Sequence, residues 1–177
     1  IEPLNMMGAR LSSDKGMLPI STYASKIMNN FEYEMPIASA QVKSCLLLTA
    51  MSAKKNIKIT EPKITRDHTE RMIDFFGGDI AYGNNQNSRL IELNYSELEP
   101  KDTFNVPGDF SSASFIIVAT IISKDSEVLI KNVGLNESRK GLLEILTLMG
   151  ADIFIKNQKE ISNEIVGDIY VRSSELN

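Results

Sequence analysis

The order of apolar and polar residues predicts a helix-rich segment followed by strands. Between residues 39 and 53, apolar side chains recur at helical spacing and leave little polar surface, which predicts a largely buried helix. Residues 57–60 alternate between apolar and polar positions, which predicts a strand. Residues 65–76 return to helical spacing, and strands are expected at 79–82 and 89–93. The segment therefore has the predicted order helix, strand, helix, strand, strand.

A second segment repeats this order. Its pattern predicts a very apolar helix at 111–122, a strand at 127–131, an amphipathic helix at 137–149, and strands at 152–155 and 168–172. Self-similarity of this kind means that one supersecondary unit is used twice. Helices covering a mixed sheet, repeated along the chain, predict an α/β or α+β fold.

Particular residues also match between the two segments. Pro36 and Arg66 of the first correspond to Pro107 and Arg139 of the second. The first thirty residues supply only the end of an earlier unit, with a helix end near 4–7 and strands near 9–12 and 18–22. Function is expected where the two copies differ.

Composition narrows the class of protein. The chain has 177 residues and 42% hydrophobic content, enough to bury a core, and no apolar run approaches the ~20 residues that a membrane span needs. The single Cys45 lies in an apolar helical run, which predicts a small buried side chain and no internal disulfide. A net charge of −4 without a basic run argues against nucleic-acid binding. We therefore expect a cytoplasmic protein that binds neither nucleic acid nor membranes.

Three predicted helix starts carry polar clusters, at residues 39–41, 65–68 and 108–112. A helix N-terminus presents unpaired N–H groups and the positive end of the helix dipole, so a serine there and an arginine from a neighbouring start can bind phosphate. Ser and Asp at such positions are also common helix caps, so capping remains the alternative. Asp67 followed by Glu70 predicts a capping box.

Arg66 favours the anion-binding interpretation. Its planar guanidinium matches phosphate or carboxylate oxygens, and a cation in the first turn of a helix is otherwise unfavourable. Arg139 occupies the same place in the second copy, so inherited packing is the alternative. His68 has no second histidine or cysteine with which to share a metal, so a surface or interface role is expected and no metal site is predicted.

Four motifs together resemble the 5-enolpyruvylshikimate-3-phosphate synthase family. They are PIASAQVKS at 36–44, TRDHTE at 65–70, VPGDFSSA at 106–113 and MGADI at 149–153. They occur in the family's order across essentially the whole chain. Ala40 and the TRDHTE run are more similar to the bacterial glyphosate-tolerant class than to the plant-like class.

The resemblance implies an enzyme that transfers the enolpyruvyl group of phosphoenolpyruvate to the 5-hydroxyl of shikimate 3-phosphate and releases phosphate, in the shikimate pathway of aromatic amino-acid biosynthesis. It also implies a monomer without metal or organic cofactor, built from βαβαββ units. Ser39 and Ala40 would hold the phosphate of shikimate 3-phosphate. Gln41 would contact the shikimate ring and the phosphoenolpyruvate side, and Arg66 would reach the same substrate.

The resemblance further divides the chain between two globular domains, residues 1–105 in the first and 106–177 in the second. The family's catalytic acid–base groups lie in segments that correspond to none of these residues, so we expect an interior fragment that is inactive and incompletely folded by itself. Two alternatives remain: a non-catalytic repeat or anion-binding module of the same fold, and UDP-N-acetylglucosamine enolpyruvyl transferase, whose motifs differ at 39–41 and 108–112.

Overall fold

The computed structural model describes residues 1–85 and 88–177 and divides into two compact units, Ile1–Pro100 and Lys101–Asn177. The division lies close to the boundary expected after Asn105. That the two units belong to two larger domains stays a prediction.

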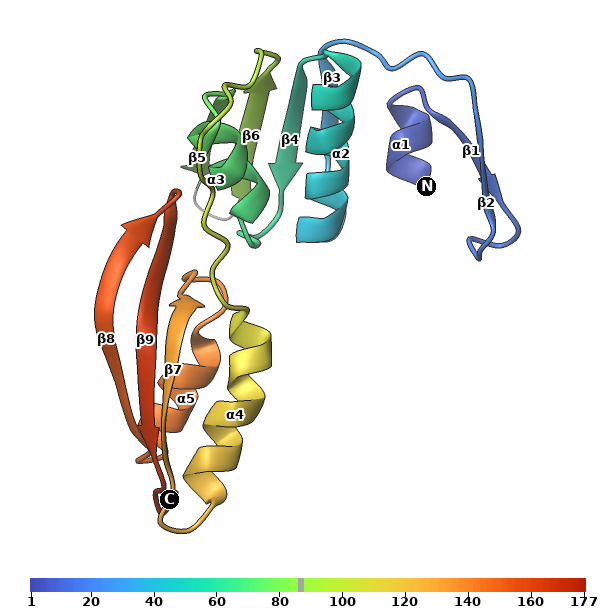
Figure 1. Ribbon diagram of the computed structural model, residues 1–177. Coiled ribbons are helices and arrows are strands. Elements are labelled where there is room, and N and C mark those ends of the chain that lie inside the picture. Colours follow the sequence, from blue (N-terminus) through green and yellow to red (C-terminus); the bar gives the residue numbers. More distant parts are fainter. Residues whose placement is uncertain (86–87) are drawn as a thin grey trace. The chain divides into compact units, whose positions relative to one another are not determined.

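The first unit is built around a mixed sheet of four strands with the order β3-β4-β6-β5. β3 and β4 are parallel, whereas β6 is antiparallel to both of its neighbours (Figure 1). The predicted order of helix, strand, helix, strand, strand is confirmed, and the sequence prediction missed the strand β3. Residues 83–88, between the predicted strands 79–82 and 89–93, have a composition that predicts a turn, but 83–85 and 88 belong to β5 and β6, and residues 86 and 87 lie outside the described residues. The elements are β3 (Phe31–Glu34), α2 (Ala40–Ala53), β4 (Ile57–Glu61), α3 (His68–Phe75), β5 (Asp79–Asn85) and β6 (Ser88–Asn94).

The beginning of the chain forms α1 (Glu2–Met6) and a two-stranded antiparallel sheet of β1 (Arg10–Ser13) and β2 (Ile20–Tyr23), close to the predicted positions. Met7 follows α1 and is fully buried in the same apolar cluster as residues of α2 and β4. This early segment is therefore part of the first unit's core.

The second unit repeats the order of helix, strand, helix, strand, strand, as predicted. Its sheet has the order β7-β9-β8 and is antiparallel throughout. A single parallel bridge between Gly108 and Val133 stands where the first unit has the strand pair β3 and β4. The elements are α4 (Phe110–Ile122), β7 (Glu127–Gly134), α5 (Gly141–Leu148), β8 (Asp152–Ile161) and β9 (Glu164–Arg172).

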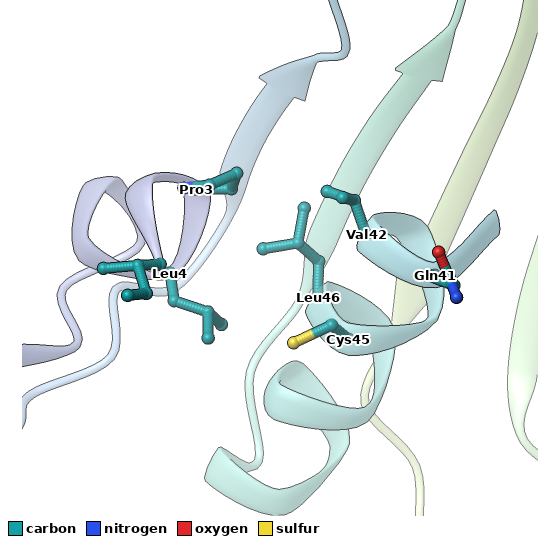
Figure 2. Close-up of a pocket in the computed structure, with 7 residues that line it drawn as sticks. Pro3, Leu4, Gln41, Val42, Cys45 and Leu46 are labelled. Atoms are coloured by element: carbon teal, nitrogen blue, oxygen red, sulfur yellow. The ribbon is translucent and has the colours of Figure 1, made fainter. Parts of the chain in front are cut away.

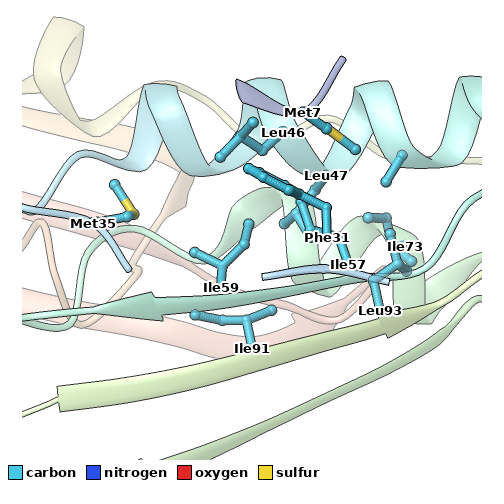
Figure 3. Packing of buried hydrophobic residues seen from close by; sticks show 11 residues of the cluster. Met7, Phe31, Met35, Leu46, Leu47, Ile57, Ile59, Ile73, Ile91 and Leu93 are labelled. Atoms are coloured by element: carbon cyan, nitrogen blue, oxygen red, sulfur yellow. The ribbon is translucent and has the colours of Figure 1, made fainter. Parts of the chain in front are cut away.

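The core of the first unit lies between its sheet and α2. Alternate residues of β4 point inward, so Ile57 and Ile59 pack against Leu46 and Leu47 of the helix (Figure 3). Burying side chains of this size contributes about 1.5–3 kcal/mol each. The core therefore fixes the distance between α2 and β4.

The predicted burial of Cys45 was wrong. Cys45 is exposed, because it lies on the side of α2 that faces away from the sheet, while Lys43 takes one of the fully buried positions. In α4, Phe115 and Ile122 are more than two-thirds exposed although the helix is apolar all round, because the sheet covers only one of its sides. None of the helices in residues 1–85 and 88–177 is both long and apolar enough to span a membrane.

Candidate functional site

The starts of α2 and α3 lie at the same edge of the first sheet. β3 and β4 are parallel, α2 follows β3, and α3 follows β4, so both helices begin at the carboxyl end of these strands (Figure 1). Ligands of open α/β sheets commonly bind at this edge. The two starts carry the four predicted site residues, which are Ser39, Ala40, Gln41 and Arg66.

Ser39 is the N-cap of α2, and its hydroxyl accepts a hydrogen bond of 3.3 Å from the backbone N–H of Val42. Ser39 is therefore a helix cap, as the capping alternative predicted. Ala40 is the first helical residue. Gln41 is exposed and lies at the rim of a shallow apolar pocket between α1 and α2, beyond Val42 and Cys45 as seen from α1 (Figure 2).

Arg66 lies outside its helix, contrary to the prediction that placed it in the first turn. α3 begins at His68, so Arg66 belongs to the connection from β4 and does not oppose the helix dipole as a member of the first turn. It is half-buried, and within the part of the chain that the structure describes its guanidinium has no hydrogen bond or ion pair. This arginine therefore carries a charge that the described residues do not neutralise.

The predicted capping box was wrong. Asp67 is the N-cap of α3 but makes no side-chain cap hydrogen bond. Its carboxylate instead forms ion pairs with Arg71 Nε at 3.0 Å and with an Arg89 guanidinium nitrogen at 3.7 Å. Glu70 is fully buried and binds Lys43, so its carboxylate is not available to the helix cap.

A group of buried ions lies beneath the helix starts, and the sequence analysis missed it. Lys43 Nζ of α2 is 3.2 Å from both carboxylate oxygens of Glu61 and 2.7 Å from Glu70 Oε1. All three side chains are fully buried. Glu61 also accepts hydrogen bonds from Thr65, of 3.2 Å from its backbone N–H and 2.7 Å from its hydroxyl.

A second contact joins the same two helices nearby. The hydroxyls of Ser44 and Thr69 share a hydrogen bond of 2.7 Å. Together with the bond between Lys43 and Glu70, it connects the second turn of α2 to the first turn of α3. The structure therefore brings together the two helix starts that carry Ser39 and Arg66.

The third predicted cluster lies in the second unit, and its polar groups bind one another or Arg139. Asp109 caps α4 and accepts hydrogen bonds of 2.8 Å from the backbone N–H of Ser112 and 3.0 Å from its hydroxyl. Hydrogen bonds from Ser112, with a smaller effect from the Arg139 charge, hold the pKa of the Asp109 carboxyl below its ordinary value. Arg139 lies 3.3 Å from the Asp109 carboxylate and donates a hydrogen bond of 2.5 Å to the Ser111 hydroxyl.

The two copies differ at this point. Ser39 and Asp109 are equivalent caps, Gln41 and Ser111 are both second residues of their helices, and each arginine stands two residues before the next helix. In the second unit an acidic cap neutralises the arginine. The neutral cap Ser39 gives Arg66 no such partner among the described residues, and a guanidinium of this kind can bind an anion.

No group of three or more histidine, cysteine, aspartate or glutamate side chains in residues 1–85 and 88–177 is arranged to hold a metal ion. His68 is exposed and interacts with another residue. Hydroxyl, amide and guanidinium groups, from Ser39, Gln41 and Arg66, stand at the starts of α2 and α3.

The repeated unit of helix, strand, helix and two strands, preceded in its first copy by a parallel strand, defines the enolpyruvyl transferase class of folds. The model of the family EPSP synthase (3-phosphoshikimate 1-carboxyvinyltransferase) matches residues 1–176. The chain belongs to this family.

Individual relatives agree with this assignment. The chain is 48% identical to a 3-phosphoshikimate 1-carboxyvinyltransferase of Petrotoga mobilis, over 99% of this chain and 40% of the relative. It is 46% identical to one of Legionella pneumophila strain Lens, over 98% of this chain and 39% of that protein. A solved EPSP synthase of Acinetobacter baumannii matches with a TM-score of 0.78 and 38% identity, over 98% of this chain and 38% of that one. The chain thus spans about 40% of the length of the curated relatives that it matches.

Proposed function

We propose that this chain is part of an enzyme that transfers the enolpyruvyl group of phosphoenolpyruvate to the 5-hydroxyl of shikimate 3-phosphate. Membership of the EPSP synthase family and identities of 46% and 48% to two such transferases support the activity. Because the chain spans about 40% of these relatives, the catalytic acid and base would come from other parts of the complete enzyme. This chain would contribute binding and no catalytic residue.

The proposed contribution is a site for the phosphate of shikimate 3-phosphate. Ser39 and Ala40 at the start of α2 would offer the hydroxyl and backbone N–H groups, and Arg66 would offer the cation. Gln41 would hydrogen-bond the ring and face the phosphoenolpyruvate side. The observation that carries the proposal is that no carboxylate of residues 1–85 and 88–177 neutralises Arg66 in the way that Asp109 neutralises its counterpart Arg139.

Further features of the complete enzyme belong to the same proposal. The units Ile1–Pro100 and Lys101–Asn177 would be parts of its two globular domains. It would act as a cytoplasmic monomer without metal or organic cofactor. The exposed free thiol of Cys45 suits a reducing compartment.

Titration of the complete enzyme with shikimate 3-phosphate tests the site. Arg66→Ala removes charge-assisted hydrogen bonds worth about 1.5–3 kcal/mol, so the Kd should rise about 10–100-fold. Gln41→Ala removes neutral hydrogen bonds and should weaken binding less. Lys63→Ala is the control, because it removes an exposed cation from the same connection and should leave the Kd nearly unchanged.

Unchanged affinity in both Arg66→Ala and Gln41→Ala would refute the site assignment. An active site that is intact in the complete enzyme but prefers a uridine diphosphate sugar would instead favour the related UDP-N-acetylglucosamine transferase. A complete protein that binds the anion without turnover would favour a binding module of the same fold.

A further inference from the structure

We propose that Lys43, Glu61 and Glu70 are positioning residues, a buried ion group that fixes Arg66 and the two helix starts for anion binding. The inference rests on the proposed function of this site. Glu61 ends β4, Lys43 lies in the second turn of α2, and Glu70 lies in the first turn of α3. The ion group therefore joins the three elements that surround the candidate site.

The ion group acts on Arg66 through the residue before it. Glu61 receives both the backbone N–H and the hydroxyl of Thr65, at 3.2 and 2.7 Å. Two hydrogen bonds to one buried carboxylate fix the backbone at Thr65, and the direction of the next side chain follows from that backbone. Hydrogen bonds to charged groups have strict geometry and are stronger than neutral ones, so they suit this role.

The start of α3 is held by the same cation. Glu70 Oε1 forms an ion pair of 2.7 Å with Lys43 Nζ, and in the described residues neither oxygen of the Glu70 carboxylate has a hydrogen-bond partner. Lys43 is therefore the contact that ties this carboxylate to α2. Ser39 and Gln41 lie at the start of the same helix, within four residues of Lys43. The Lys43 ammonium group therefore links the start of α2 to the start of α3.

The second unit shows that the packing does not require these ions. Lys43 and Ala113 are both the fourth residue of their helix, and Glu70 and Leu143 are both the third. Val133, the first buried residue after an irregularity in β7, takes the inward place that Glu61 has in β4. These positions are buried in both units but apolar in the second.

The comparison of the two units favours a role of the buried ions in positioning over a role in stability. Buried ion groups are often no better for stability than apolar residues of similar volume, and the second unit has apolar residues, Ala113 a smaller one, at these places. The ions are present in the copy whose Arg66 has no charged partner among the described residues, and absent from the copy whose Arg139 is held by Asp109. A side chain that binds a ligand works best when it is already held in the binding orientation. Directional hydrogen bonds and ion pairs can hold it there.

The first experiment replaces the three buried ions of the first unit with apolar side chains, as at the matching places of the second unit. In the complete enzyme, Lys43→Met, Glu61→Val and Glu70→Leu are combined, and shikimate 3-phosphate binding is measured by calorimetry together with KM for each substrate. We expect Kd and KM for shikimate 3-phosphate to rise about tenfold or more, with KM for phosphoenolpyruvate and the thermal midpoint little changed. A folded triple variant with wild-type affinity would overturn the proposal.

A milder variant decides the question even if the triple variant does not fold. Thr65→Val removes the hydroxyl donor to Glu61 and leaves all three ions in place. It should raise the Kd for shikimate 3-phosphate several-fold, while the lost hydrogen bond lowers the thermal midpoint by about a few degrees and the protein stays folded. The matched control is Thr49→Val. Among the described residues the Thr49 hydroxyl donates only to the carbonyl of Cys45 within α2, so its loss should leave the Kd unchanged.

Arg66→Ala separates this inference from the proposed function. If Arg66→Ala leaves affinity unchanged, the anion site itself is wrong. If Arg66→Ala weakens binding while Thr65→Val binds as the wild type does, the site is right and the positioning role is wrong.

Discussion

Replacing Lys43 by methionine should destabilise the first unit strongly. Methionine keeps most of the buried hydrocarbon stem and removes the ammonium group that lies 3.2 Å from Glu61 and 2.7 Å from Glu70. The group changes from one cation and two carboxylates to two carboxylates alone, all fully buried. Removing one partner of a buried ion pair costs about 3–5 kcal/mol, because it leaves an uncompensated buried charge.

Amide hydrogen exchange measures this loss within the first unit. The inner strand β4 pairs on both sides, so its amides exchange only when the sheet opens. A loss of about 3–5 kcal/mol should accelerate their exchange by about 10²–10⁴-fold, since 1.4 kcal/mol is a factor of ten. Adding Glu61→Val and Glu70→Leu should restore most of the protection, because no buried charge then remains.

A surface pair supplies the control. Lys58 and Glu92 also approach to 2.7 Å, but both side chains are more than two-fifths exposed, so Lys58→Met should change exchange of β4 little. If Lys43→Met exchanges as slowly as the wild type, or if the triple variant is less protected than Lys43→Met, the electrostatic reasoning is refuted.

Three further predictions concern the rest of the fold. Ile59→Ala truncates a fully buried side chain of β4 and should cost about 2–5 kcal/mol by urea unfolding, and a cost below about 1 kcal/mol would contradict the assigned core. Gly141→Ala adds a methyl group at the first residue of α5, where the new carbon would have no heavy atom of other parts of the chain within 4 Å. It should stabilise the fold by about 0.4–1 kcal/mol, and a lower thermal midpoint would contradict this. The pKa of Asp109 is held below its ordinary value of 3.8, so its stabilising effect is present above that value and is lost as pH falls through the lowered pKa. Wild type should therefore lose stability more steeply than Asp109→Asn between about pH 5 and about pH 2, and parallel profiles would contradict this assignment.

Periodicity predicted most of the fold because burial in this chain follows local patterns. Ile57 and Ile59 alternate with polar residues in β4, and the structure places both in the core. The missed strand β3 carries the same signal, since Phe31 and Tyr33 alternate with Glu32 and Glu34. That strand could have been predicted from its sequence.

Features that depend on distant partners could not be predicted in the same way. Lys43 and Glu61 are separated by 18 residues, so their burial follows from tertiary pairing and not from spacing within one helix or strand. The late start of α3 has the same origin, since Thr65 is bound to Glu61 and lies outside the helix. The cap at Ser39 was within reach of sequence analysis, whereas the neutralisation of Arg139 by Asp109 required coordinates.

The pairing of Arg139 with Asp109 also suggests how a duplicated fold can diversify. A new receptor for negatively charged metabolites does not need an added cation when the ancestral unit already carries one held by its own acid. A single exchange of aspartate for serine at a helix start would release that charge toward solvent. Recognition would then arise from deletion of an internal competitor, a route open to any repeat protein whose helix caps are acidic.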